Sequence, residues 1–131
     1  MTPILITPIY AAMLAILMAV LSTRVGILRG KYNVALGDGG EPGLALPIRH
    51  FGNLSEYAAM AVVVLLLMEL RGVDAFWLHL YGGGLVVLRL LHPVVLFDRM
   101  DAPFWKKAGR FVAAAGTAAL LSGGAVLLLV G

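Results

Sequence analysis

The sequence predicts an all-α integral membrane protein built as a bundle of four membrane-spanning helices. The 131 residues are 61% hydrophobic and only 13% charged, whereas a soluble globular domain is about 45–50% apolar and about 25% charged. Four long apolar runs follow one another along the chain, and most charged residues lie between them. Because each spanning helix takes roughly 20 apolar residues, we expect a single domain over residues 1–131 and exclude a soluble monomer.

The first spanning helix is predicted over about residues 4–28. No basic region precedes this apolar run, so we interpret it as a helix rather than a cleaved signal peptide. A polar loop follows, in which Gly37-Asp38-Gly39-Gly40 has the composition of a turn. The second helix is predicted over about residues 47–70, because Pro47 suits the first turn of a helix and a long apolar run follows it.

The third helix is predicted over about residues 75–97 and the fourth over about residues 108–130. At about 1.5 Å per residue, each run can cross a hydrocarbon core of roughly 30 Å. The alternating pattern of a membrane barrel strand is absent, which leaves the helix as the spanning element. Small residues such as Gly82-Gly83-Gly84 favour close packing between these helices.

The basic residues predict the orientation of the bundle. Eight of the ten lysines and arginines flank the first and third loops: Arg24, Arg29, Lys31, Arg49, Arg99, Lys106, Lys107 and Arg110. The positive-inside rule therefore places loops 29–46 and 98–107 in the cytoplasm and both termini outside, and we expect a multi-pass membrane protein. Because these charges flank apolar runs, they indicate loops and lipid headgroups rather than nucleic-acid binding.

Polar side chains within the second and third helices are the strongest functional signal. Arg49, Asn53 and Glu56 are spaced i, i+4, i+7 and share one helix face, with Tyr57 beside them. Arg89 and His92 are three residues apart in the third helix and lie in its cytoplasmic half, like the polar face of the second helix. Ionisable groups in a spanning helix are costly and usually face the bundle interior or a wet cavity. We therefore expect both sets to meet in one polar cavity, between helices of one chain or between chains.

A purely structural interpretation stays open beside the functional one. Arg49 could extend to the lipid headgroups, Glu56 and Arg89 could form an ion pair, and Asn53 could hydrogen-bond a neighbouring helix. As a ligand site, several arginines with one glutamate suit a small zwitterion rich in carboxylate. Glutathione is one candidate beside amino acids, nucleotides and lipid headgroups. The chain has no cysteine, and its three histidines form no metal constellation, so we expect no metal cofactor.

These residues resemble the signature of the MAPEG family, the membrane-associated proteins in eicosanoid and glutathione metabolism. The similarity rests on Arg49-x-x-x-Asn53-x-Ser55-Glu56-Tyr57 at the start of the second of four helices. It is supported by the small size, by the first loop with Gly37-Asp38-Gly39-Gly40, and by Arg89-x-x-His92 in the third helix. The resemblance is closest to bacterial members similar to microsomal glutathione S-transferases, which implies a location in the bacterial inner membrane.

The resemblance implies a homotrimer of four-helix bundles with glutathione as co-substrate, bound between subunits near the cytoplasmic side. It implies that a lipophilic electrophile or hydroperoxide arrives from the membrane lipids. Carried over by position, the glutathione contacts are Arg49, Asn53, Glu56 and Tyr57, with Arg29, Arg89 and His92 as secondary candidates.

The sequence departs from the family at the residues that carry catalysis. The eicosanoid enzymes place tyrosines further along the third helix, where this chain has His92, Pro93 and Leu96. No arginine falls cleanly at the thiol-activating position of the fourth helix, and Arg99 and Arg110 are the catalytic candidates. Two alternatives therefore remain: a non-catalytic protein of the same fold that binds lipid or a partner, and an unrelated small transporter or scaffold.

Overall fold

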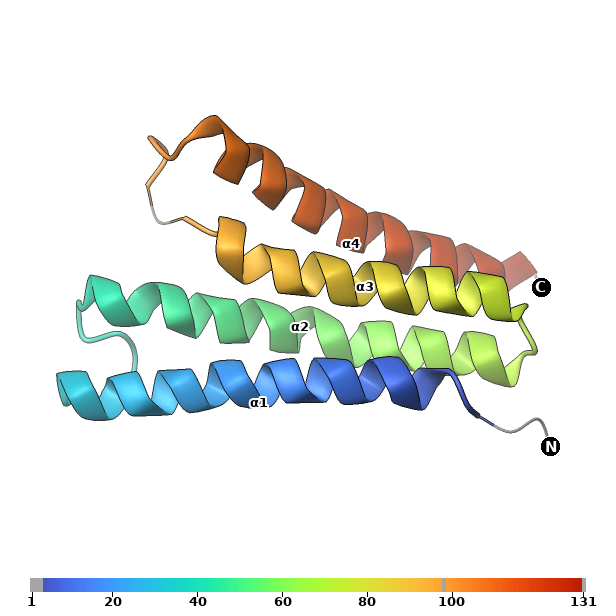
Figure 1. The fold of residues 1–131 in the computed structure, drawn as a ribbon, viewed down its shortest axis with the longest axis horizontal. Helices are drawn as coiled ribbons and strands as arrows, with labels where there is room; N and C mark the ends of the chain where they lie inside the picture. The colour runs from blue at the N-terminus through green and yellow to red at the C-terminus, as the bar shows by residue number, and fades with distance from the viewer. Residues whose placement is uncertain (1–3, 98, 131) are drawn as a thin grey trace.

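The computed structural model describes residues 4–97 and 99–130 and contains four helices in this part of the chain. They are α1 (Thr7–Tyr32), α2 (Pro42–Leu70), α3 (Ala75–Val95) and α4 (Phe104–Val130). All four are long and apolar enough to cross a membrane, which confirms the predicted all-α membrane class. Successive helices run in opposite directions (Figure 1). The α1–α2 and α3–α4 connections lie at one end, called here the loop end, and the α2–α3 turn lies at the other, the turn end.

Three helices, α1, α2 and α4, are longer at the loop end than their apolar runs predicted. α1 continues to Tyr32, where Asn33 adopts a left-handed conformation and its N–H and that of Val34 bond the last carbonyls. α2 begins at Pro42 rather than Pro47, because Glu41 caps it with its backbone carbonyl and Pro42 opens its first turn. Hydropathy therefore marks the membrane-crossing part of a helix, whereas capping sets its ends.

The other end points differ for the same reason. α3 ends at Val95 rather than residue 97, and α4 begins at Phe104 rather than Ala108. The backbone N–H groups of Lys106 and Lys107 bond the Pro103 carbonyl, so this basic stretch forms the first turn of α4. A charged turn is compatible with a helix that extends beyond the hydrocarbon core.

The centre of the bundle is formed by α2 and α3, with α1 packed against both and α4 on the other side (Figure 1). The buried apolar core contains Leu14 and Leu21 of α1, Leu54, Ala61, Leu65 and Met68 of α2, and Leu78, Tyr81 and Leu85 of α3. Glycines allow the helices to pack closely against one another, as the small residues in the sequence indicated. A Cβ on Gly82 would collide with the Tyr10 ring, and one on Gly116 would lie 2.8 Å from Leu88 Cδ1.

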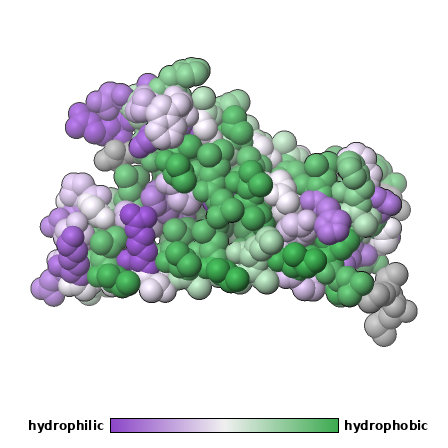
Figure 2. All heavy atoms as spheres, in the orientation of Figure 1, coloured by the Kyte–Doolittle hydropathy of each residue, from purple (hydrophilic) through white to green (hydrophobic). Residues whose placement is uncertain are grey.

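The outer surface fits a lipid environment. Figure 2 shows a broad apolar surface over the middle of the bundle, with hydrophilic residues concentrated at the loop end. The exposed apolar side chains include Ile16, Val20, Met60, Val87 and Val112. An exposed apolar area of this extent is rare on a soluble monomer.

Glu69 closes the turn end in a way that the sequence did not indicate. Its carboxylate accepts hydrogen bonds from the backbone N–H groups of Leu5, Ile6 and Thr7, each at 2.7 Å. The first N–H groups of a helix lack intrahelical partners, and a negative charge there is favoured by the helix dipole. A carboxylate of α2 thus caps α1 and fixes the two helices to each other.

Candidate functional site

A pocket of about 230 Å³ opens at the loop end, between the first turns of α2 and α4 and the last turns of α3. It is lined by Ala45, Leu46, Arg49, Asn53, His92, Leu96, Phe97 and Arg110. Four of the residues singled out from the sequence, Arg49, Asn53, His92 and Arg110, therefore meet in one cavity although they come from three helices. Of the two polar sets predicted to meet in one cavity, Glu56, Tyr57 and Arg89 do not line it.

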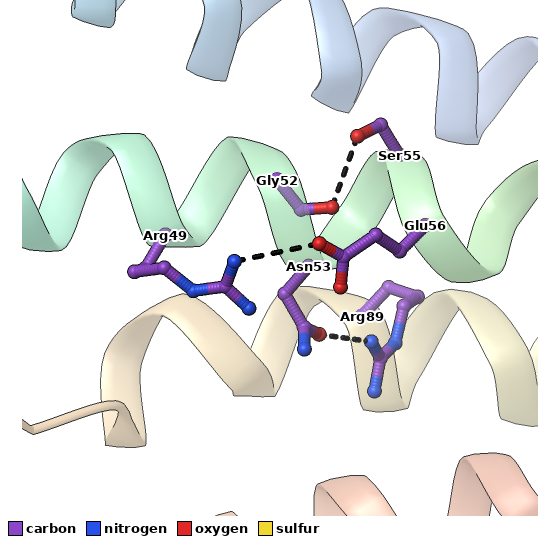
Figure 3. Close-up of polar contacts among 6 residues, drawn as sticks. All are labelled: Arg49, Gly52, Asn53, Ser55, Glu56 and Arg89. Atoms are coloured by element: carbon purple, nitrogen blue, oxygen red, sulfur yellow. Dashed lines mark hydrogen bonds and ion pairs between the residues drawn. The ribbon is translucent and has the colours of Figure 1, made fainter. Parts of the chain in front are cut away.

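Arg49 and Glu56 are paired on the exposed face of α2. Arg49 Nη1 lies 3.4 Å from Glu56 Oε1 across nearly two helical turns, and the two side chains are 58% and 55% exposed. Gly52 lies beneath the pair, with no side chain of its own between the two partners (Figure 3). The ion pair considered from the sequence, Glu56 with Arg89, does not form, because Glu56 takes the arginine of its own helix.

Arg89 is buried and joins three helices. Its Nη1 donates to Asn53 Oδ1 of α2 at 2.6 Å, and its Nη2 donates to Thr117 Oγ1 of α4 at 2.7 Å and to the Ala113 carbonyl at 3.1 Å. The Tyr57 ring centroid lies 5.4 Å from the Arg89 guanidinium carbon, within cation–π range. Only 2% of Arg89 is exposed. It contacts Asn53 (Figure 3) and does not itself line the pocket.

The two arginines proposed for catalysis are placed differently. Arg110 of α4 lines the pocket, and its guanidinium carbon lies 4.9 Å from the Phe97 ring centroid. Arg99 lies in the α3–α4 connection, pairs with Asp101 at 3.5 Å and does not line the pocket. The structure therefore separates two candidates that the sequence left equal.

Two further predicted contacts lie away from the pocket of the single chain. Arg29 donates from Nη1 to the Gly37 carbonyl at 2.8 Å and to the Ala35 carbonyl at 3.3 Å, which holds the α1–α2 loop against the end of α1. Tyr57 is 39% exposed on the outer face of α2 and does not line the pocket.

Thr117 and Phe97 are parts of the site that the sequence did not single out. Thr117 accepts from Arg89, and Phe97 forms a wall beside Arg110. A lone hydroxyl within the apolar run of α4 could have indicated Thr117. Phe97 gave no such signal, because an aromatic residue at the end of a spanning helix usually belongs to the interfacial belt.

The wall of the pocket suits an anionic ligand. Arg49 and Arg110 present guanidinium groups, Asn53 and His92 add further polar groups, and Leu46, Leu96 and Phe97 supply apolar surface. Guanidinium groups bind carboxylates with two parallel hydrogen bonds. Among the described residues, no group of three or more acidic or histidine side chains could hold a metal ion.

Comparison with known proteins agrees with this architecture. The chain matches the MAPEG family over residues 7–129. It is 35% identical over 105 residues to the "Inner membrane protein YecN" of Escherichia coli strain K12 and to the protein of the same name from E. coli O6:H1, strain CFT073. In each case the aligned segment covers 80% of this chain and 79% of the relative. No solved structure gives a significant match.

The fold and the pocket thus define a small four-helix membrane protein with a polar site at one end. The chain belongs to the MAPEG family. It is a multi-pass protein of the bacterial inner membrane.

Proposed function

We propose that the pocket at the loop end binds glutathione and that the protein is a glutathione transferase or peroxidase acting on lipophilic electrophiles at the cytoplasmic side. The observation that carries this proposal is the convergence of Arg49, Asn53, His92 and Arg110 on one cavity. Arg49 suits a carboxylate of glutathione, and Glu56, one turn beyond Asn53 and outside the pocket lining, suits its ammonium group.

In the transferase reaction the glutathione thiolate attacks the electrophilic carbon and the leaving group departs with the bonding electrons. A nearby cation stabilises the thiolate and lowers the pKa of the thiol, and this effect is strong where water is excluded. Arg110 supports this role better than Arg99, because Arg110 lines the pocket and Arg99 is paired with Asp101 in the exposed connection. The apolar residues beside it, Leu96 and Phe97, suit a hydrophobic second substrate.

We further propose that the site is completed in a homotrimer. One chain offers a pocket of about 230 Å³, below the roughly 300–1,000 Å³ of typical small-molecule sites. The Arg49–Glu56 pair is exposed on a helix that crosses the membrane, and charged groups there usually face protein or water rather than lipid. A neighbouring subunit over this face would cover the pair and extend the pocket, and membrane lipids would surround the remaining apolar surface.

Isothermal titration of the detergent-solubilised protein with glutathione tests binding. An assay with glutathione and a chlorinated aromatic electrophile, followed by chloride release and conjugate formation, tests transfer. We expect saturable binding, and we expect Arg110→Met to reduce turnover at least tenfold while Arg99→Met changes it less than twofold. The absence of glutathione binding to the assembled parent protein would refute the proposed function.

The alternative is a non-catalytic membrane protein whose polar face serves assembly. It is supported by the internal pairing of the polar residues, since Arg49 bonds Glu56 and Arg89 bonds Asn53 and Thr117 without any ligand. Under this alternative, glutathione would neither bind nor raise the unfolding temperature, and Glu56→Gln would weaken the oligomer instead.

A further inference from the structure

We propose that Arg89 is a positioning residue rather than a ligand contact: it fixes Asn53 so that the side-chain NH₂ group points into the pocket as a hydrogen-bond donor. The ligand must then present an acceptor oxygen, from a carboxylate or a carbonyl, at this point of the wall. The inference rests on the pocket being the ligand site proposed above. It changes the role of Arg89 and specifies which end of a zwitterionic ligand faces Asn53.

The direction of the Asn53 amide follows from the chemistry of arginine. A guanidinium group has only donors and no acceptor, so the atom that Arg89 Nη1 contacts at 2.6 Å must be the Asn53 oxygen. The NH₂ group of the same amide is then turned away from Arg89, as Figure 3 shows. Asn53 Nδ2 donates to no acceptor among the described residues, whereas Asn53 lines the pocket.

Arg89 can impose this direction because its own position is fixed. Its Nη2 donates to both Thr117 Oγ1 and the Ala113 carbonyl. Thr117 donates its own hydroxyl proton to the Ala113 carbonyl at 2.7 Å, so that a lone pair of its oxygen faces Arg89. Arg89 of α3 is therefore the donor on both sides, to Thr117 and the Ala113 carbonyl of α4 and to Asn53 of α2.

The charge of Arg89 strengthens the donor that reaches the pocket. No carboxylate pairs with Arg89 in the part of the chain that the structure describes, and its buried Nε has no partner there. A charged donor on the amide oxygen draws electron density from the NH₂ group, and hydrogen bonds polarised in series reinforce one another. An anionic acceptor at Asn53 would also gain from the positive charge directly behind it.

Asn53→Asp separates this role from a structural one. The aspartate keeps an oxygen for Arg89 and gains an ion pair with it, but it replaces the pocket-facing donor by a carboxylate oxygen. We expect the oligomer to stay assembled with an unfolding temperature at or above that of the parent, while glutathione affinity falls at least tenfold in isothermal titration. An unchanged affinity in the folded Asn53→Asp variant would overturn the inference.

The chain offers a matched pair at Thr117 that tests the contribution of Arg89. Thr117→Val keeps the shape but removes the acceptor for Arg89 Nη2, and Thr117→Ser retains the hydroxyl. We expect the valine variant to bind glutathione about three- to tenfold more weakly and the serine variant to stay within twofold of the parent. If the two variants bind glutathione with equal affinity, Arg89 does not position Asn53.

Ligand analogues test the specificity directly. Glutathione in which one carboxylate is converted to a primary amide offers an N–H donor, and the two such analogues are titrated separately. We expect the parent to prefer glutathione over both analogues, and Asn53→Asp to recover relative affinity for the analogue whose amide replaces the carboxylate at this position. Identical preferences in parent and variant would contradict a donor at Asn53.

The orientation also has a readout that needs no ligand and so stands apart from the proposed function. The chain has two asparagines, Asn33 and Asn53, and no glutamine, so ¹⁵N labelling gives two side-chain NH₂ signals, assigned with Asn33→Gly. We expect the Asn53 NH₂ protons to exchange with water in the parent and their signal to shift in Thr117→Val but not in Thr117→Ser. Asn53 NH₂ protons that are protected from exchange would refute the proposed orientation of the Asn53 amide. If these protons exchange but the parent does not bind glutathione, only the proposed function is refuted.

Discussion

At the scale of single residues, the polar side chains at the loop end differ in how deeply they are buried and in how many hydrogen-bond partners they have. Arg89 is buried and bonded to two other helices, so its removal would disturb the bundle itself. Arg49 and Glu56 are more than half exposed, and among the described residues the side chain of each pairs only with the other. They are therefore the residues at which a ligand contact can be separated from folding, because an exposed ion pair contributes little to stability.

We predict that Glu56→Gln and Arg49→Met each weaken glutathione binding by roughly ten- to a hundredfold. A hydrogen bond to a charged group contributes about 1.5–3 kcal/mol, and each 1.4 kcal/mol corresponds to about a tenfold change in affinity. Isothermal titration of assembled protein measures the effect. Leu36→Ala is the matched control, since Leu36 is exposed in the α1–α2 loop away from the pocket. Parent-like affinity in both assembled variants would favour the structural alternative.

At the scale of the helices, the bundle is held together by contacts between elements that no single helix sequence reveals. The clearest case is the carboxylate of Glu69 on the first turn of α1. The Ile6 side chain provides no cap, so the start of α1 depends on a residue of α2. The Arg89 network does the same for α2, α3 and α4 at the opposite end.

We predict that Glu69→Gln lowers the unfolding temperature in detergent by several degrees. Oε1 accepts from Leu5 and Ile6 and Oε2 from Thr7, and a glutamine would place an NH₂ donor against one of these N–H groups. Leaving a buried polar group without its partner costs about 1–3 kcal/mol. A thermal melt followed by circular dichroism measures the loss. Glu41→Gln is the control: it removes a carboxylate that makes no capping bond and should have the unfolding temperature of the parent. Equal unfolding temperatures for both variants would show that the Glu69 carboxylate does not stabilise the start of α1.

At the scale of the whole molecule, the distribution of charge and apolar surface determines how the bundle lies in the membrane. The loop end carries the hydrophilic surface and the middle of the bundle is apolar (Figure 2). The basic residues that flank the α1–α2 and α3–α4 connections lie at that end, which favours a cytoplasmic location for it.

We predict that the loop end faces the cytoplasm and both termini face outward. Because the chain has no cysteine, a single Asp38→Cys variant gives one labelling site in the α1–α2 loop. A membrane-impermeant maleimide should leave it unlabelled in spheroplasts and label it after lysis. Ala75→Cys, at the turn end, should be labelled already in intact spheroplasts. Ready labelling of position 38 in intact spheroplasts would reverse the orientation.

We also predict an oligomer, a homotrimer, in mild detergent. The exposed Arg49–Glu56 pair and the incomplete pocket both require a further surface, and a second or third copy of the chain offers the same helices in a symmetric arrangement. Native mass spectrometry of the detergent-solubilised protein gives the copy number directly. A monomer that retains glutathione binding would contradict the shared site.

The membrane class, the number of helices and the depth of the polar residues could all be predicted from hydropathy and helical spacing. Hydrophobicity over some twenty residues and i, i+4 spacing are local properties of the chain, which is why Arg49, Asn53 and His92 could be placed on the pocket before the fold was known. Helix ends were predicted less well, because backbone capping rather than hydropathy sets them, as Asn33 and Glu41 show.

The hydrogen-bond and ion-pair partners of the polar side chains could not be predicted in this way and follow from the packing of the helices. The tertiary structure paired Glu56 with Arg49 rather than Arg89, brought Thr117 to Arg89, placed Arg110 rather than Arg99 on the pocket, and set Glu69 on the start of α1. These choices depend on how neighbouring helices are rotated and shifted against each other. That arrangement is set by the packing of apolar side chains and glycines over the full length of the bundle, so no local pattern in one helix can reveal it.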